Sequence, residues 1–153
     1  MTITSILVTE HTIFTGVFDQ IESALGEARS RSEVRTMARI VAGMLERHGN
    51  AERDLAYAAL DHALAERQSL EQMHQEHEEI DQNLRNALRS ESLPEARRNL
   101  AAALATCRSH FAFEEALVFP LMERVLQRDT LTALGKEWAR KPDRMLEDDA
   151  KAA

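Results

Sequence analysis

HFAFEEALVFP, residues 110–120, has the aromatic and aliphatic density of a buried helix, yet it begins with His110 and carries Glu114 four residues later. Residues four apart lie one turn apart on the same face of a helix, so both side chains are expected to point into the core. An imidazole and a carboxylate need partners there, because burying an unpaired charge costs on the order of several kcal/mol. Those partners must come from elsewhere in the chain.

The rest of the chain carries the same helical period. Apolar residues recur at spacings of three and four, which indicates helices and not strands. Ser32 is expected to cap the second helix, Pro94 to lie in the first turn of the fourth, and Pro120 to kink the fourth or lie near its end. The four expected helices cover approximately residues 7–25, 32–60, 70–88 and 94–121.

These helices predict an all-α fold, an up-down-up-down antiparallel four-helix bundle joined by short connections. A short fifth helix carrying Leu131, Leu134 and Trp138 is expected to cover one end of the bundle. The predicted organisation is a bundle over residues 1–141 followed by a flexible polar tail at residues 142–153.

Composition excludes several classes of protein. The 153 residues suit one domain, and the formal charge of −7 argues against a nucleic-acid partner. The single cysteine cannot form an intramolecular disulfide, and no stretch approaches the roughly 18 apolar residues of a membrane span. The sequence therefore predicts a cytoplasmic protein with no membrane partner, as a monomer or homodimer.

Polar residues interrupt the apolar stripes at one level of the predicted bundle. With the first turn near residue 30, His11 lies 19 residues before it and His48 lies 18 after it. With the third turn near residue 92, His77 lies 15 before it and His110 lies 18 after it. Since an α-helix rises about 1.5 Å per residue, these positions can converge. The set predicted to bind metal is His11, His48, Glu52, His77, His110 and Glu114.

An internal repeat supports a pair of metal ions. The dipeptide Glu-His occurs at residues 10–11 and 76–77, and the pattern H-x-x-x-E occurs at 48–52 and 110–114. A duplicated helical hairpin would present two similar half-sites, in which each imidazole binds one metal and each carboxylate reaches across to bridge both. Imidazole and carboxylate ligands without thiolate suit iron, manganese or zinc.

Other residues near this level have less distinctive patterns. His74, one turn before His77, is predicted as a further ligand. His62 is interpreted as a surface histidine and Cys107 as a small core residue. Glu115 adjoins a predicted ligand, and we expect it to be solvated or to contact a ligand from outside.

These residues resemble the hemerythrin-like, or HHE cation-binding, domain. The pattern H…H-x-x-x-E…H…H-x-x-x-E spans about residues 5–126, and the run E-E-x-x-V-F-P at 114–120 agrees with it. The resemblance implies a non-haem di-iron centre in which Glu52 and Glu114 bridge the metals and the histidines are terminal ligands.

The expected function follows from this resemblance. Oxygen-carrying hemerythrins resemble H-x-x-x-H on the third helix and H-x-x-x-x-D on the fourth, whereas this chain has His74-x-x-His77 and His110-x-x-x-Glu114. The expectation is a protein that binds or senses oxygen, peroxide or nitric oxide at two iron ions. The alternatives are a di-iron oxidoreductase that removes peroxide, and a zinc-binding or structural interaction bundle; manganese accepts similar ligands.

Overall fold

The computed structural model describes residues 1–63 and 68–140, and this part of the chain is helical without a strand. The predicted tail at 142–153 and the side chain of His62 lie outside the described residues. The predicted all-α class and helical bundle are confirmed for the described part. Its elements are α1 (Ile3–Glu27), α2 (Arg31–Ala51), η1 (Glu52–Tyr57), α3 (Ala58–Ala63), α4 (Gln68–Arg89), α5 (Leu93–Phe113), η2 (Glu114–Val118), α6 (Phe119–Val125) and α7 (Arg128–Arg140).

Serine caps set the beginning of two long helices. The hydroxyl of Ser30 accepts a hydrogen bond from the backbone N–H of Glu33 at 3.3 Å, and Ser92 does the same for Glu95 at 3.3 Å. In both cases the serine is followed three residues later by a glutamate, which is the sequence of a capping box. The expectation that Ser32 caps the second helix was therefore wrong. The cap is Ser30, because Glu33 lies three residues after it and completes the capping box.

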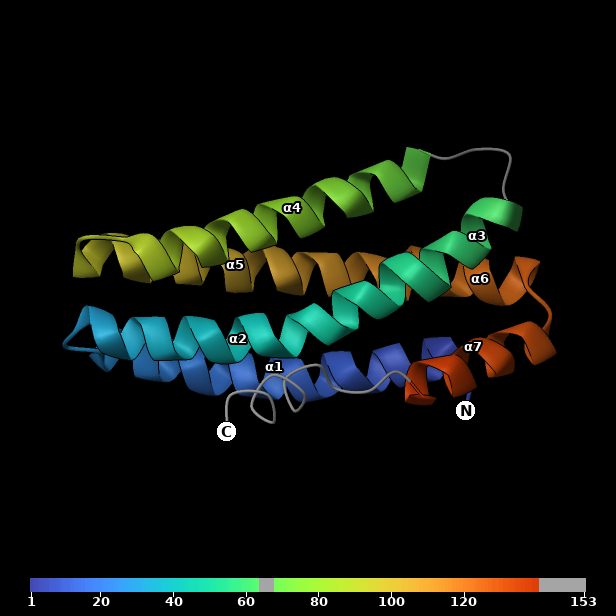
Figure 1. Cartoon of the computed structure of the whole chain (residues 1–153), viewed down its shortest axis with the longest axis horizontal. Helices are drawn as coiled ribbons and strands as arrows, with labels where there is room; N and C mark the ends of the chain where they lie inside the picture. The colour runs from blue at the N-terminus through green and yellow to red at the C-terminus, as the bar shows by residue number, and fades with distance from the viewer. Residues whose placement is uncertain (64–67, 141–153) are drawn as a thin grey trace, which may run out of the picture.

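Figure 1 shows the two long helical pairs side by side. α1 lies along α2, α4 lies along α5, and the short connections of both pairs lie at the same end of the molecule, at the left of the view. α7, where the fifth helix was expected, lies against α1 near the other end. Pro120 lies in the first turn of α6, which ends at Val125. No helix among the described residues is long and apolar enough to cross a membrane.

Two clusters of buried apolar residues form the core. The first lies toward the connected ends of the long helices and contains Phe14, Phe18, Ile21, Leu25, Ala28, Val34, Ala38, Val41, Ile80, Leu84, Ala87, Ala96, Leu100, Ala103, Leu104, Cys107 and Phe111. The second contains Ile3, Leu7, Ala56, Tyr57, Leu60, Met73, Val118, Phe119, Met122 and Leu131. Cys107 is a core residue, as predicted, and burial raises the pKa of its thiol to about 12. His11 contacts both clusters, through Phe111 of the first and Phe119 of the second.

Candidate metal centre

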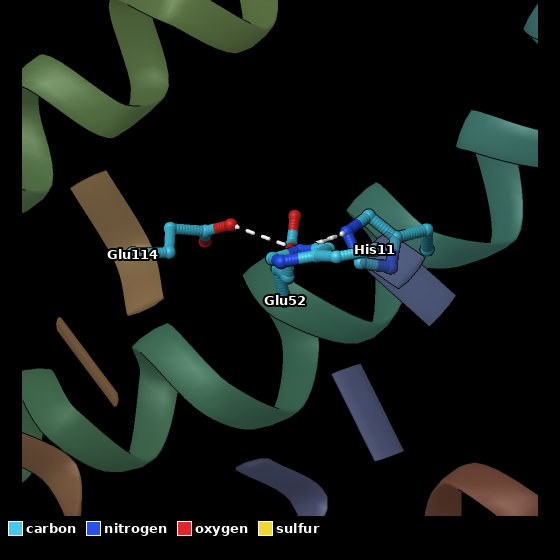
Figure 2. A group of neighbouring side chains, drawn as sticks. His11, Glu52 and Glu114 are labelled. Atoms are coloured by element: carbon cyan, nitrogen blue, oxygen red, sulfur yellow. Dashed lines mark hydrogen bonds and ion pairs between the residues drawn. The ribbon is translucent and has the colours of Figure 1, made fainter. Parts of the chain in front are cut away.

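Six predicted side chains from both helical pairs meet in the interior. All are buried except His77, whose side chain keeps 11% of its surface exposed. Figure 2 shows His11, Glu52 and Glu114 pointing toward one another from separate elements. The six are His11 of α1, His48 of α2, Glu52 of η1, His77 of α4, His110 of α5 and Glu114 of η2.

Four of them form a first group, in which one ligand-type atom from each residue lies within 4.8 Å of the others: His11, His48, Glu52 and Glu114. The Nε2 atom of His48 is 2.6 Å from Oε1 of Glu52, and Nε2 of His11 is 3.4 Å from Oε2 of Glu114. The two Nε2 atoms are 3.1 Å apart. Nitrogen and oxygen donors at this density match the ligand set of a transition metal.

A second group shares a residue with the first. Ligand-type atoms of Glu52, His77 and His110 lie within 4.8 Å of one another. Oε2 of Glu52 is 3.0 Å from Nε2 of His77, whereas its other oxygen, Oε1, faces His48. The carboxylate of Glu52 therefore faces both groups, one oxygen toward each.

Each of the two buried glutamates begins a π-helical segment: η1 begins at Glu52 and η2 begins at Glu114. A π-helix bonds residue i to i+5, so it rotates the following residues relative to an α-helix. Glu52 and Tyr57 would point about 140° apart on an α-helix, but both are buried in η1. The local widening thus lets a carboxylate and the residues after it face the interior together.

Two further glutamates support histidines from outside the groups. Oε2 of Glu10 lies 3.0 Å from Nδ1 of His48, and Oε2 of Glu76 lies 2.8 Å from Nδ1 of His110. An imidazole that donates its Nδ1–H to a carboxylate keeps Nε2 available for a metal and is held in one orientation. This role was not predicted, although the repeated Glu-His dipeptide is its signal in the sequence: each glutamate contacts the histidine of the next long helix.

The remaining two histidines have outer partners of opposite charge. Oε1 of Glu115 lies 2.8 Å from Nδ1 of His11, which agrees with the expected outside contact. At His77, the guanidinium Nη1 of Arg53 lies 3.4 Å from Nδ1. A guanidinium has donors and no acceptor, so Nδ1 of His77 accepts this bond. The neutral ring then carries its proton on Nε2, facing Glu52.

Protons balance the buried carboxylates of the metal-free protein. Burial disfavours the charged form of His11, but hydrogen bonds with Glu114 and Glu52 outweigh it and raise its pKa to about 9. At His48 burial also disfavours the charged form, but the charge of Glu52 and hydrogen bonds to Glu10 and Glu52 together outweigh it and raise the pKa to about 10. Burial alone would raise the pKa of Glu52, but His48 and His11 hold it well below its usual range. Metal binding through Nε2 must displace a proton from each of these two rings.

Tyr57 is a buried residue with a polar hydroxyl that was not among the predicted site residues. Its hydroxyl donates a short hydrogen bond to Oε1 of Glu114, and its ring stacks on His77 with centroids 6.0 Å apart. Burial and the nearby carboxylates, Glu52 foremost, raise the pKa of this phenol, so it stays protonated and donates. Tyr57 thereby fixes the orientation of Glu114. Tyr57 follows Glu52 by five residues, a spacing that does not place two side chains on the same face of an α-helix, so the helical period did not predict its place in the site.

Aromatic rings close the site from the core side. The ring of Phe111 stacks on His11 with centroids 3.9 Å apart, and Phe14 meets His48 edge-on at 5.2 Å. Both phenylalanines belong to the first apolar cluster. They therefore form an apolar wall on this side of the site.

The structure does not bring His74 into either group. Its side chain is exposed, and its ring lies edge-on to Tyr57 with centroids 5.9 Å apart. It lines a polar pocket outside the site together with Arg53 and His77. Its role as a ligand stays a prediction.

The chemistry of the buried donors fits a metal. Both oxygens of Glu52, Oε2 of Glu114 and Nε2 of His110 are buried without a well-aligned hydrogen-bond partner. The imidazoles beside Glu52 and Glu114 offset part of the cost of burying these carboxylates, and a cation would coordinate the atoms that lack a well-aligned hydrogen bond. The arrangement can therefore hold metal ions.

The comparisons with known proteins agree with this site. No curated protein and no solved structure matches the chain. The family model of the hemerythrin HHE cation binding domain matches residues 2–122. This match covers both helical pairs and all six donor residues, and the chain belongs to the hemerythrin HHE cation-binding domain family.

Proposed function

We propose that the protein binds two iron ions, one at each group of donors, with Glu52 bridging them. The observation that carries this proposal is the placement of Glu52, whose Oε1 is 2.6 Å from His48 and whose Oε2 is 3.0 Å from His77. A carboxylate that faces two donor groups is suited to a dinuclear centre, as in other helical-bundle carboxylate sites. Imidazole and carboxylate donors without thiolate suit non-haem iron.

The proposed activity is binding or sensing of oxygen or a related small ligand such as peroxide or nitric oxide. A pair of iron ions supplies reversible one- and two-electron chemistry when bound. The chain supplies orientation through Glu10, Glu76 and Glu115, and Phe111 keeps water from the core side of His11. The carboxylates of Glu52 and Glu114 would leave two iron(II) ions with about two positive charges, which would favour ligand binding over oxidation of C–H bonds.

The experiment is anaerobic loading of the full chain with iron(II), followed by metal analysis and a visible spectrum after oxygen is added. We expect two iron ions per chain and a charge-transfer band. Glu52→Gln keeps the shape of the side chain but removes the charge that faces both groups, so it should lower iron content to one ion or fewer. Glu46→Gln, an exposed position on α2, is the matched control.

Three outcomes would contradict the proposal: no bound metal, full iron content in Glu52→Gln, or the same loss in Glu46→Gln. Zinc is the second candidate metal, because the first group offers four donors, the number that structural zinc sites use. One zinc ion per chain, retained in preference to iron, would replace the di-iron proposal. His74→Ala tests the seventh predicted ligand, and unchanged metal content in this variant would remove it from the set.

A further inference from the structure

The two halves of the site differ at one equivalent position. Glu115 follows Glu114 and contacts Nδ1 of His11 at 2.8 Å. The equivalent residue of the other half follows Glu52 and is Arg53, which contacts Nδ1 of His77 at 3.4 Å. The repeat therefore places an anion beside one histidine and a cation beside the other.

A hydrogen bond from Arg53 and coordination of a metal ion require the proton of the neutral His77 ring to lie on different nitrogens. While Arg53 donates to Nδ1, the neutral ring carries its proton on Nε2, which faces Glu52 at 3.0 Å. Coordination through Nε2 requires the proton to lie on Nδ1, and that atom can then no longer accept from a guanidinium. Metal binding by His77 therefore frees this donor of Arg53, whose side chain is exposed and keeps a 2.7 Å bond to Asn50.

A pocket lies beside Arg53. Its lining includes Gly49, Arg53, His77, Asp81 and His110, and it offers water-sized molecules about 30 Å³ of space. That volume exceeds the roughly 10–15 Å³ that one water molecule needs. A larger pocket of about 240 Å³ shares Arg53, His77 and Asp81 and opens outward. The two pockets share lining residues, and the inner one adjoins the side of the site that has His77 and His110.

Gly49 contributes to this space. A Cβ atom at Gly49 would lie 3.2 Å from Nη1 of Arg53 and 3.8 Å from its Cζ. The glycine therefore allows the guanidinium to lie close to α2, where it reaches both Asn50 and His77.

The pocket also leads to the group with fewer protein donors. The second group has three donor residues, Glu52, His77 and His110, whereas the first has four. An ion held by these three residues would keep a position open to an external ligand, as three-ligand catalytic metal sites do. The outer pocket is lined by two arginines and two carboxylates, so its charges balance, and among these four groups Arg53 hydrogen-bonds to His77.

We propose that this pocket admits a small monoanionic ligand to the metal centre and that Arg53 is the positioning residue that binds the anion there. This inference rests on the proposed metal centre and adds a ligand class and an entry side to it. Charge-assisted hydrogen bonds from a guanidinium are about twice as strong as neutral ones, which suits capture of an anion beside a metal.

The test is a spectroscopic titration of the iron-loaded full chain with azide, with metal content measured for every variant. Arg53→Gln should weaken azide binding about tenfold, and Arg53→Lys should keep most of the affinity. Arg53→Glu restores the equivalence with Glu115, so it should retain metal at least as well as the wild type yet weaken azide about 100-fold. Arg31→Gln, exposed at the other end of α2, is the charge-matched control and should leave the affinity unchanged.

Gly49→Ala tests the entry path separately. The added methyl group narrows the pocket and displaces the end of the Arg53 side chain, so azide association should slow several-fold. Gly16→Ala makes the same change where nothing lies within 4 Å of the new Cβ, and its association rate should match the wild type.

The outcomes separate the two proposals. Full metal content with azide affinities of Arg53→Gln and Arg53→Glu within about twofold of the wild type would overturn the assignment of Arg53 and leave the metal centre intact. Loss of metal in Arg53→Gln would also overturn it, since Arg53 would then support metal retention and not the anion. A wild-type chain that binds no metal would overturn the proposed function together with this inference.

Discussion

Glu52 and Glu114 differ from most glutamates of this acidic chain in having no access to water. Both have 0% exposure, and their oxygens face imidazole nitrogens from several helices. A buried carboxylate is stable when opposite charges or hydrogen bonds surround it, and here His11 and His48 supply both. At the scale of single residues, the site is a set of mutually compensating buried charges, so each change to one of them should appear in metal binding.

Glu76→Gln should weaken metal binding without removing a donor of either group. The carboxylate accepts from Nδ1 of His110 at 2.8 Å, and an amide at this place can donate instead and allow the wrong tautomer. Loss of such an outer partner typically costs about 10–100-fold in metal affinity. Competition with a chelator measures it, with Glu79→Gln, exposed on the same helix, as control. Equal affinities for the two variants would contradict the role assigned to Glu76.

Metal affinity should rise with pH. The pKa of His11 is raised to about 9 and that of His48 to about 10, so both rings are protonated at neutral pH in the metal-free protein. Binding through Nε2 releases one proton from each ring, and each released proton makes the affinity increase about tenfold per pH unit below these pKa values. The gain should level off above about pH 9 to 10.

Calorimetry of metal binding in buffers with different ionisation enthalpies counts these protons directly. Release of two protons per chain at pH 7 is the expected result. A proton count of zero, or an affinity that does not change between pH 6 and pH 8 after correction for the buffer, would contradict the protonated state of the two rings.

At the scale of the elements, the π-helical segments η1 and η2 place the carboxylates. The helical period identified the long helices and the faces on which His48 and His110 lie. The helical period could not identify the π-helical segments. The spacing of four residues from His48 to Glu52, or from His110 to Glu114, is the same whether an α-helix or a π-helix follows the glutamate. The wider turn depends on contacts with neighbouring helices, such as the hydrogen bond from Tyr57 to Glu114.

Deletion of Ala116 should disrupt the site through η2. Ala116 is exposed, so its side chain contributes little, but removing one residue converts the wide turn toward an α-helical one and rotates the following residues by about 100°. Either Glu114 leaves the site or Val118 leaves the core, so we expect loss of metal and a lower melting temperature. Ala116→Ser, which keeps the chain length, is the control. Wild-type metal content in the deletion variant would show that η2 does not position Glu114.

At the scale of the whole molecule, the site is protected by core on both sides. The first apolar cluster packs between the connected ends of the hairpins, and the second is closed by α7, which contributes Leu131. α7 packs on α1, and Arg47 lies over the ring of Trp138 at 4.2 Å. Packing of α7 and binding of metal are therefore carried by different residues and can be tested separately.

Gly135→Ala should destabilise the fold through this contact. A Cβ at Gly135 would lie 2.6 Å from the carbonyl oxygen of Met1 and 3.2 Å from the backbone nitrogen of Ile3, so the backbone must shift. Overpacking of this kind typically costs about 1–3 kcal/mol. Gly16→Ala has open space and should stabilise its helix by about 0.5–1 kcal/mol. Thermal unfolding of the metal-free variants measures both, and equal melting temperatures would contradict the close packing of α7.

The sequence by itself determined the helices, the buried donors and their common level, because helical period and residue spacing are local properties that fix which side chains share a face and height. The tertiary structure decided what those donors contact. It placed Glu10 and Glu76 on histidines of neighbouring helices, directed Tyr57 to Glu114, and left His74 exposed. It also set Arg53 beside His77 where Glu115 stands beside His11. These pairings depend on how each helix is rotated against its neighbours and on the π-helical turns. The spacing of apolar residues along the sequence specifies neither the rotation nor the turns.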